Sequence, residues 1–163
     1  WYRAEVQVIR TANAVSDIIY PGQKLLIPDA QSGQAAVTAS VSSSAFSAAD
    51  VDLLARLVQA EATGEPYTGK VSVAAVVLNR VRSPNFPNSI SGVIYQPMQF
   101  CPVQNGTINR PAGAEASGAA RDAINGWDPT GGALYFFNPA KTTNSFIWSR
   151  PVIITIGNHH FTR

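Results

Sequence analysis

The chain has 163 residues, of which 45% are hydrophobic and 13% charged, enough for one buried core but too few for a large multidomain assembly. Its 12 basic and 10 acidic residues give a formal net charge of +2, and they form no basic patch of the kind that nucleic-acid binders carry. No uninterrupted run of about 18 apolar residues is present, so we expect neither a nucleic-acid partner nor a membrane span. The single cysteine, Cys101, and the adjacent His159 and His160 match no common zinc spacing, so we expect no disulfide scaffold, metal or cofactor.

The first part of the chain is too short for an independent core. Its segment Tyr20-Pro-Gly-Gln-Lys-Leu-Leu-Ile-Pro28 indicates a turn followed by a short strand over Lys24–Ile27. This phrase resembles the closing half of a lysin motif, a module that binds N-acetylglucosamine in peptidoglycan and chitin. We therefore predict a partial lysin-motif-like, wall-binding segment at residues 1–29. The start at Trp1 rather than Met is what a processed chain would show.

A change of composition separates this segment from the rest. Residues 30–45 carry no charged and no aromatic side chain, which is typical of a flexible linker. We place the linker at 30–46 and one compact domain at 47–163.

Helical patterns dominate the first half of that domain. Ser47-Ala-Ala-Asp50 has capping-box spacing and predicts a helix that ends before Gly64 and Pro66. Apolar periodicity predicts further helices at Tyr67–Arg82 and about Ala114–Asn125, with Gly126 as the C-terminal cap and one helical turn around Ser89–Tyr95.

Strand patterns follow the helices. The runs Ala133–Phe137 and Val152–Ile156 are aromatic or β-branched and are bounded by Gly, Asn and Pro. We expect them to pair antiparallel across their connecting loop. Helices first and a small antiparallel sheet later predict an α+β domain.

Glu61 is the most informative position. It follows Leu57 by four residues and Leu54 by seven, so helix geometry places its carboxyl on the apolar face. Burial raises the pKa of a carboxyl, and an acid that is still protonated near neutral pH can donate its proton to a leaving oxygen. The alternative is that Glu61 reaches solvent or caps a backbone group.

Conventional glycosidases use two carboxyl groups, so the other acids bear on the mechanism. Glu65 and Asp128 are the candidates for a second one. Glu65 precedes Pro66 in a turn, where an acid commonly caps the next helix, and Asp128-Pro129 is typical of a turn start. No acid follows Asp128, so a mechanism with a single acid stays open.

Polar and aromatic residues gather in the loops of the domain. Aromatic faces stack on sugars, and amides match the hydroxyl and N-acetyl groups of glycans. The alternative for each is a place in the core or in a turn. The predicted substrate contacts are Tyr95, Gln99, Phe100, Asn138, Trp148 and Ser149. His159 and His160 are neighbours on a strand and face opposite ways, so one metal cannot easily take both.

Five segments, in order, resemble the catalytic domain of the spore cortex-lytic enzymes of endospore-forming bacteria, a cell-wall hydrolase family. The match runs over essentially all of residues 50–161, and its segments are Leu53–Gly69, Val73–Val81, Phe86–Tyr95, Gly126–Tyr135 and Ile147–Pro151. The sequence departs from the family pattern at Thr63, where Arg is more frequent, and at Met98 and Cys101.

This resemblance implies a lysozyme-related fold and cleavage of the β-1,4 bond between N-acetylmuramic acid and N-acetylglucosamine. The catalytic glutamate of the family corresponds to Glu61. In the lytic transglycosylase reaction that the family implies, this one carboxyl protonates the glycosidic oxygen, and the carboxylate then takes the C6 hydroxyl proton as a 1,6-anhydro ring closes.

From these observations we expect a monomer that acts on peptidoglycan glycan strands and is secreted or held in the cell envelope, including the spore coat or cortex region. Three alternatives remain at this stage. They are a muramidase that uses water with help from Glu65 or Asp128, a peptidoglycan-binding protein without activity, and a metalloamidase that uses His159 or His160.

Overall fold

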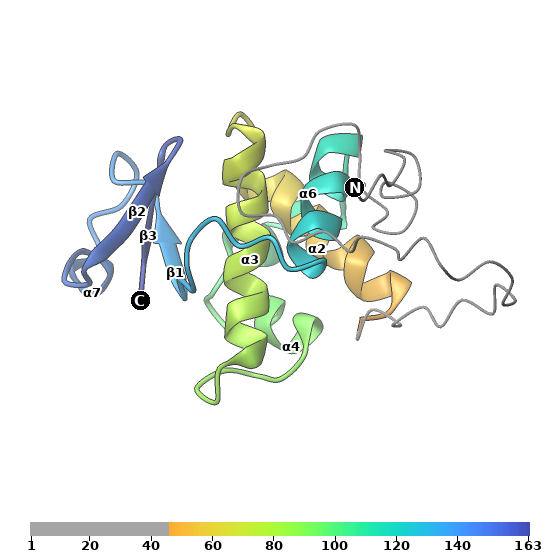
Figure 1. The fold of residues 1–163 in the computed structure, drawn as a ribbon, viewed down its shortest axis with the longest axis horizontal. Coiled ribbons are helices and arrows are strands. Elements are labelled where there is room, and N and C mark those ends of the chain that lie inside the picture. The colour runs from red at the N-terminus through yellow and green to blue at the C-terminus, as the bar shows by residue number, and fades with distance from the viewer. Residues whose placement is uncertain (1–45) are drawn as a thin grey trace, which may run out of the picture. The chain divides into compact units, whose positions relative to one another are not determined.

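The structure, a computed structural model, describes residues 46–163. The lysin-motif-like segment at 1–29 and the linker at 30–46, apart from Phe46, lie outside the described residues and stay predictions. The described part is one unit in which helices precede a small sheet (Figure 1). Its elements are α2 (Ala48–Glu61), α3 (Tyr67–Arg82), α4 (Ile90–Ile94), α5 (Cys101–Gln104), η1 (Thr107–Asn109), α6 (Ala114–Ile124), β1 (Tyr135–Phe137), α7 (Ser145–Trp148), β2 (Val152–Ile156) and β3 (His159–Thr162).

Helix α2 begins at its predicted capping signal. The Asp50 amide donates to Ser47 Oγ at 3.2 Å, and the Ser47 amide donates to Asp50 Oδ2 at 3.0 Å. This reciprocal pair satisfies two backbone donors that the first turn leaves free. On the inner face of the helix, Leu54, Leu57 and Val58 are completely buried. Glu61 is the last residue of this helix and lies on the same face as these apolar residues, so it is located at the edge of the core.

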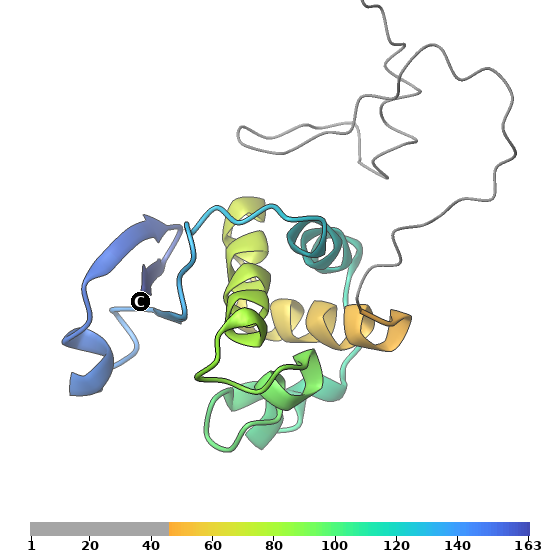
Figure 2. The same cartoon turned by 60° about the horizontal axis from the view of Figure 1, so that its bottom comes forward.

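Helix α3 is the central element. It lies between the sheet on one side and helices α2 and α6 on the other in both views (Figures 1 and 2). Valines around its circumference, among them Val71, Val73 and Val76, are therefore completely buried. Small residues allow α6 to approach closely, because a Cβ at Gly118 would lie 2.9 Å from the Tyr67 hydroxyl. The predicted boundaries of α3 are confirmed.

The sheet corrects the predicted strand pairing. Strands β1 and β2 do not pair with each other, because both pair antiparallel with β3, which gives the order β1-β3-β2. The expected hairpin between β1 and β2 is wrong for a physical reason. The two-residue turn Gly157-Asn158 makes β2 and β3 a tight hairpin, so β3 pairs with β2. Strand β1 then pairs with the other edge of β3.

Strand β3 is also the strand that sequence patterns missed. Its segment His159-His-Phe-Thr162 contains no β-branched run, yet Phe161 and Thr162 are completely buried. Phe161 packs with Val76 and Ala133 against the side of α3. The outer strand β2 leaves Val152 and Ile153 exposed. The buried position of β3 therefore comes from its place between two neighbours rather than from its own composition.

Two absences concern the described residues alone. Within residues 46–163, none of the helices has the length and hydropathy of a membrane span. In the same range, no three His, Cys, Asp or Glu side chains come together in a group able to hold a metal ion.

Candidate active site

Glu61 stands at the wall of a groove of about 490 Å³. Its side chain is half-buried, and within the described residues its carboxyl group forms no hydrogen bond or ion pair. Burial raises the pKa of this carboxyl above its usual range. The groove is lined by Gln59, Ala60, Glu61, Thr63, Cys101, Pro102, Asn105, Thr107, Arg110 and Pro111. Glu61 is thus a carboxylic acid that faces an open groove and keeps its proton to a higher pH than an ordinary glutamate.

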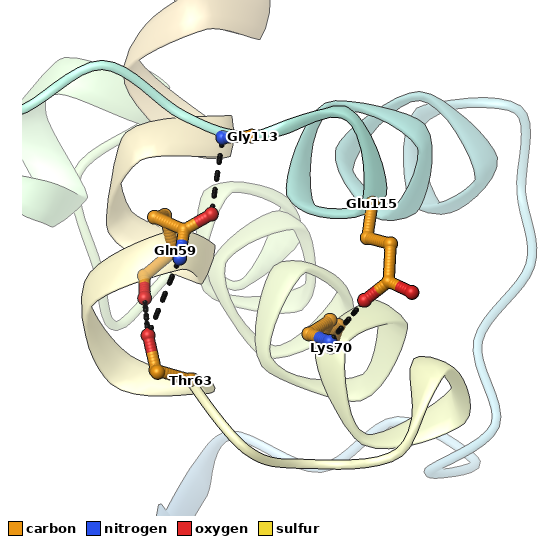
Figure 3. Close-up of polar contacts among 5 residues, drawn as sticks. All are labelled: Gln59, Thr63, Lys70, Gly113 and Glu115. Atoms are coloured by element: carbon orange, nitrogen blue, oxygen red, sulfur yellow. Dashed lines mark hydrogen bonds and ion pairs between the residues drawn. The ribbon is translucent and has the colours of Figure 1, made fainter.

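Three hydrogen bonds made by two side chains of α2 connect this helix to segments that line or adjoin the groove. Arg56 Nη1 donates to the carbonyl oxygen of Ile108 at 3.1 Å, which ties η1 to the helix. Gln59 Oε1 accepts from the Gly113 amide at 3.0 Å, and Gln59 Nε2 donates to Thr63 Oγ1 at 3.3 Å (Figure 3). The helix that carries Glu61 therefore also positions the loops opposite it.

A second set of polar contacts joins α3 to α6. Lys70 Nζ of α3 lies 2.5 Å from Glu115 Oε2 of α6, as Figure 3 shows. The Tyr67 hydroxyl donates to Asp122 Oδ2 at 2.8 Å. Glu115 and Asp122 thus have partners on α3, and neither lines the groove.

Glu65 does not play the expected capping role. Pro66 is the N-cap residue of α3, and the Glu65 carboxylate is turned instead toward the sheet, where it accepts from the Asn158 amide at 2.9 Å and from Asn158 Nδ2 at 3.0 Å. The capping role is wrong, because no side chain caps α3 and both oxygens of this buried carboxylate are taken up by the donors of Asn158. Glu65 is buried, and it does not line the groove.

Asp128 starts a turn, as its sequence indicates. Its Oδ1 accepts from the Thr130 amide at 2.8 Å and from Thr130 Oγ1 at 2.6 Å, while Oδ2 accepts from the Gly132 amide and from Asn79 Nδ2, both at 2.9 Å. Burial would raise the pKa of Asp128, but these hydrogen bonds hold it below its usual range. Both oxygens are occupied, and Asp128 is not among the residues of the groove.

The three predicted contacts between α4 and α5 do not line the groove. Tyr95 is 50% exposed and follows α4. Gln99 is exposed, and its Oε1 accepts from Arg80 Nη1 at 3.1 Å. Phe100 is 4% exposed because its ring packs against Phe136 at 6.5 Å and lies 5.4 Å from the Arg80 guanidinium. A buried ring has no free face, so this geometry does not support sugar stacking by Phe100.

The predicted contacts near α7 form a separate group. Asn138 Oδ1 accepts from the Ala140 amide at 2.9 Å, which is the turn that was the alternative for it. Trp148 is 49% exposed, packs edge-on against Phe137 at 5.1 Å and donates from Nε1 to the Thr142 carbonyl oxygen. Ser149 Oγ donates to the Phe146 carbonyl oxygen at 2.9 Å. None of these three lines the groove with Glu61.

Sequence reasoning missed most of the residues that do line it. Asn105, Thr107 and Arg110 come from the segment between Asn85 and Pro111, whose many Pro, Asn and Gln residues indicate a loop. Thr63 and Cys101 were noted only as departures from a family pattern. Their composition indicates a loop, but periodicity carries no information on which loop side chains face Glu61.

The two histidines project from opposite faces of β3, as predicted. The His159 ring packs against Phe136 at 5.3 Å on the side of α3, whereas His160 packs against Phe137 at 5.3 Å on the other side. Burial lowers the pKa of His159, although the nearby Glu65 opposes this effect. Each of the two histidines therefore packs against an aromatic ring, on its own face of the sheet.

Comparison with known proteins decides the family. The sequence pattern of the cell wall hydrolases matches residues 64–162. The chain belongs to the cell wall hydrolase family. The spore cortex-lytic enzyme of Bacillus subtilis is 53% identical over 116 residues, which cover 71% of this chain and 38% of that protein. The cell wall hydrolase CwlJ of the same species is 35% identical over 120 residues, or 69% of this chain and 84% of that protein.

Solved structures of the family agree with the fold. The catalytic domain of the Bacillus cereus SleB protein superposes with a TM-score of 0.69 at 52% identity and covers 72% of this chain and 92% of that one. The catalytic domain of the germination-specific lytic transglycosylase SleB from Bacillus anthracis gives 0.71 at 50% identity, over 73% and 98% of the two chains. The chain spans less than half the length of the spore cortex-lytic enzymes, because it covers 46% of the Bacillus cereus protein.

Proposed function

We propose that this chain is a lytic transglycosylase that cleaves the β-1,4 bond between N-acetylmuramic acid and N-acetylglucosamine in spore cortex peptidoglycan during germination. The similarity to spore cortex-lytic enzymes and to a germination-specific lytic transglycosylase supports the substrate. One observation carries the mechanism: Glu61 is the single carboxyl group that lines the groove of the described domain, and it has a raised pKa.

A single carboxyl group can perform the whole reaction. Protonated Glu61 donates its proton to the glycosidic oxygen as the bond to the muramic sugar breaks. The resulting carboxylate accepts the proton of the C6 hydroxyl of the same sugar, whose oxygen attacks C1 and closes the 1,6-anhydro ring. Glu61 ends protonated and no water is consumed. The nucleophile belongs to the substrate itself, so its effective concentration at C1 is high and the reaction does not need an activated water.

The positions of the other two acids favour this route over hydrolysis. A muramidase would need a second group to activate water, and both carboxylate oxygens of Glu65 and of Asp128 already accept hydrogen bonds away from the groove. Peptidoglycan lies outside the cell membrane, so this function also implies action in the spore envelope.

The products distinguish the candidate functions. We expect the 163-residue chain to release muropeptides that are lighter by one water than hydrolysed ones and that carry no heavy oxygen when the digestion is run in water enriched in that isotope. Mass spectrometry of purified cortex and vegetative sacculi, digested side by side, makes the measurement. Products that incorporate heavy oxygen would identify a muramidase, and binding without any product would identify a peptidoglycan-binding protein.

Arg110 is the single cation that lines the groove, and we expect it to bind carboxylates of the substrate's peptide stems. Arg110 is exposed, and an exposed ion pair contributes about 0.2–1 kcal/mol, with somewhat more for a charged hydrogen bond. Arg110→Gln should therefore raise KM for peptide-bearing strands about two- to tenfold with kcat nearly unchanged. Arg82→Gln, an exposed arginine at the end of α3 and outside the groove, is the matched control. Equal KM values for the two variants would show that Arg110 does not contact the substrate.

A further inference from the structure

The Glu65 carboxylate joins two turns that are far apart in sequence. Glu65 lies between α2 and α3, and Asn158 lies in the turn between β2 and β3. Glu65 Oε2 accepts from the Asn158 amide at 2.9 Å, and Oε1 accepts from Asn158 Nδ2 at 3.0 Å. Glu65 is 7% exposed. Its two oxygens therefore have well-defined partners, as a buried charge requires.

The two turns fit together closely enough to exclude a side chain between them. Gly157 has a φ of +59°, and a Cβ at this position would collide with Glu65 Oε2 and lie 2.8 Å from Pro66 Cδ. On the helix side, a Cβ at Gly69 would lie 3.2 Å from Glu65 Cβ. Glycine is needed at 157 both for its backbone conformation and for this close approach.

Electrostatics keep the Glu65 carboxylate charged. Burial by itself would raise the pKa of Glu65, but the two hydrogen bonds from Asn158, with His159 and Lys141 nearby, hold it below its usual range. His159 Nδ1 lies 3.9 Å from Glu65 Oε1. The contact between the turns is therefore made by an ionised group throughout the neutral pH range.

A short turn connects this contact to Glu61, which ends α2 four residues before Glu65. The amide of the buried Ala62 donates to the Val58 carbonyl oxygen at 2.9 Å, and the Glu65 amide donates to the Ala62 carbonyl oxygen at 3.1 Å. The Glu65 amide thus closes a turn onto Ala62, the C-cap residue that directly follows Glu61. Since the Glu61 carboxyl has no hydrogen bond of its own in the described domain, the backbone at the end of this helix sets where it points.

We propose that Glu65 is a positioning residue for Glu61: by holding the β2–β3 turn against the α2–α3 turn, it fixes the end of α2 and keeps the Glu61 carboxyl directed into the groove and partly shielded from water. This inference rests on the proposed role of Glu61 as the catalytic acid. It assigns to Glu65 a contact with the sheet, not with the substrate.

Two variants test it on soluble, purified glycan strands. Asn158→Ala removes one donor and leaves Glu65 in place. Glu65→Gln keeps the shape of the side chain but sets an amide where the Asn158 donors need acceptors. We expect each variant to lower kcat about tenfold and to change KM less than twofold. This loss is smaller than that expected for removal of a catalytic acid, which is about 10²–10⁴-fold.

The pH profile separates positioning from simple stability. A general acid works while protonated, so activity falls as pH rises through the pKa of Glu61, and burial places that fall at a higher pH than for an ordinary glutamate. In a variant whose helix end is loosened, water reaches the Glu61 carboxyl and lowers its pKa. The loss of activity with rising pH then begins at a lower pH. Arg110 is the other charged group that lines the groove, and neither variant changes it.

Ser47→Ala is the matched control, because it removes the cap at the opposite end of the same helix. We expect it to lower the thermal midpoint with kcat and the pH profile unchanged. If Glu65→Gln and Asn158→Ala behave in the same way, the positioning role is refuted. A loss of kcat in Glu65→Gln as large as that of Glu61→Gln would also overturn it, in favour of direct catalysis. No turnover by the unmodified chain would instead refute the proposed function.

Discussion

Glu61→Gln is expected to lower kcat on peptidoglycan strands by about 10³-fold or more, because one carboxyl serves as both acid and base and general acid–base catalysis contributes about 10²–10⁴-fold per group. Glutamine has nearly the same shape, but its amide cannot donate a proton to the glycosidic oxygen. Steady-state release of reducing or anhydro ends, with substrate binding measured separately, provides the comparison.

The same substitution should leave the fold intact. Within the described residues, the Glu61 carboxyl has no hydrogen-bond partner to lose, and a neutral amide avoids the cost of burying a charge. We therefore expect an unchanged or slightly higher thermal midpoint. Glu115→Gln is the control, since Glu115 is exposed, pairs with Lys70 and lies outside the groove. Turnover within tenfold of the unmodified chain would exclude Glu61 as the catalytic acid.

Phe161→Ala is expected to cost about 3–5 kcal/mol of the free energy of unfolding, the usual range for removing a buried aromatic side chain. Phe161 is completely buried in β3, where it packs with Val76 and Ala133, and its ring centre lies 6.0 Å from that of Phe136. Total stabilities of domains are about 5–15 kcal/mol, so this variant should be close to unfolding at moderate temperature.

Urea unfolding followed by tryptophan fluorescence measures this loss as a lower midpoint. Ile153→Ala on the outer strand β2 is the matched control, because Ile153 is 41% exposed, and it should cost less than about 1 kcal/mol. Equal losses for the two variants would mean that β3 does not form the contact between sheet and helices.

Local signals predicted the helices well. The capping box at Ser47 and Asp50, the apolar stripe of α2 and the proline after Gly64 all act over a few residues, so they can be interpreted without knowledge of the fold. The same holds for Glu61, whose place on the apolar stripe indicates burial and hence a raised pKa. The turn at Asp128 is local as well.

Sequence patterns failed where partners come from distant segments. The order of the strands depends on which edge β1 reaches, and β3 is buried by its neighbours rather than by its own residue types. For Glu65 the sequence indicates a helix cap or a second catalytic carboxyl group, because its neighbours are a turn and a helix, whereas its donors come from Asn158, 93 residues away.

The residue types of this chain determined by themselves that the first helix would end before Gly64 and Pro66, and that the Pro-, Asn- and Gln-rich segment after the second helix would be a loop. Only the tertiary structure decided that Asn105, Thr107 and Arg110 of that loop face Glu61 across a groove, while Tyr95, Gln99 and Trp148 do not. The reason is physical. Helix ends depend on hydrogen bonds within one turn of chain, whereas a groove exists only once segments with no local relationship have packed against each other.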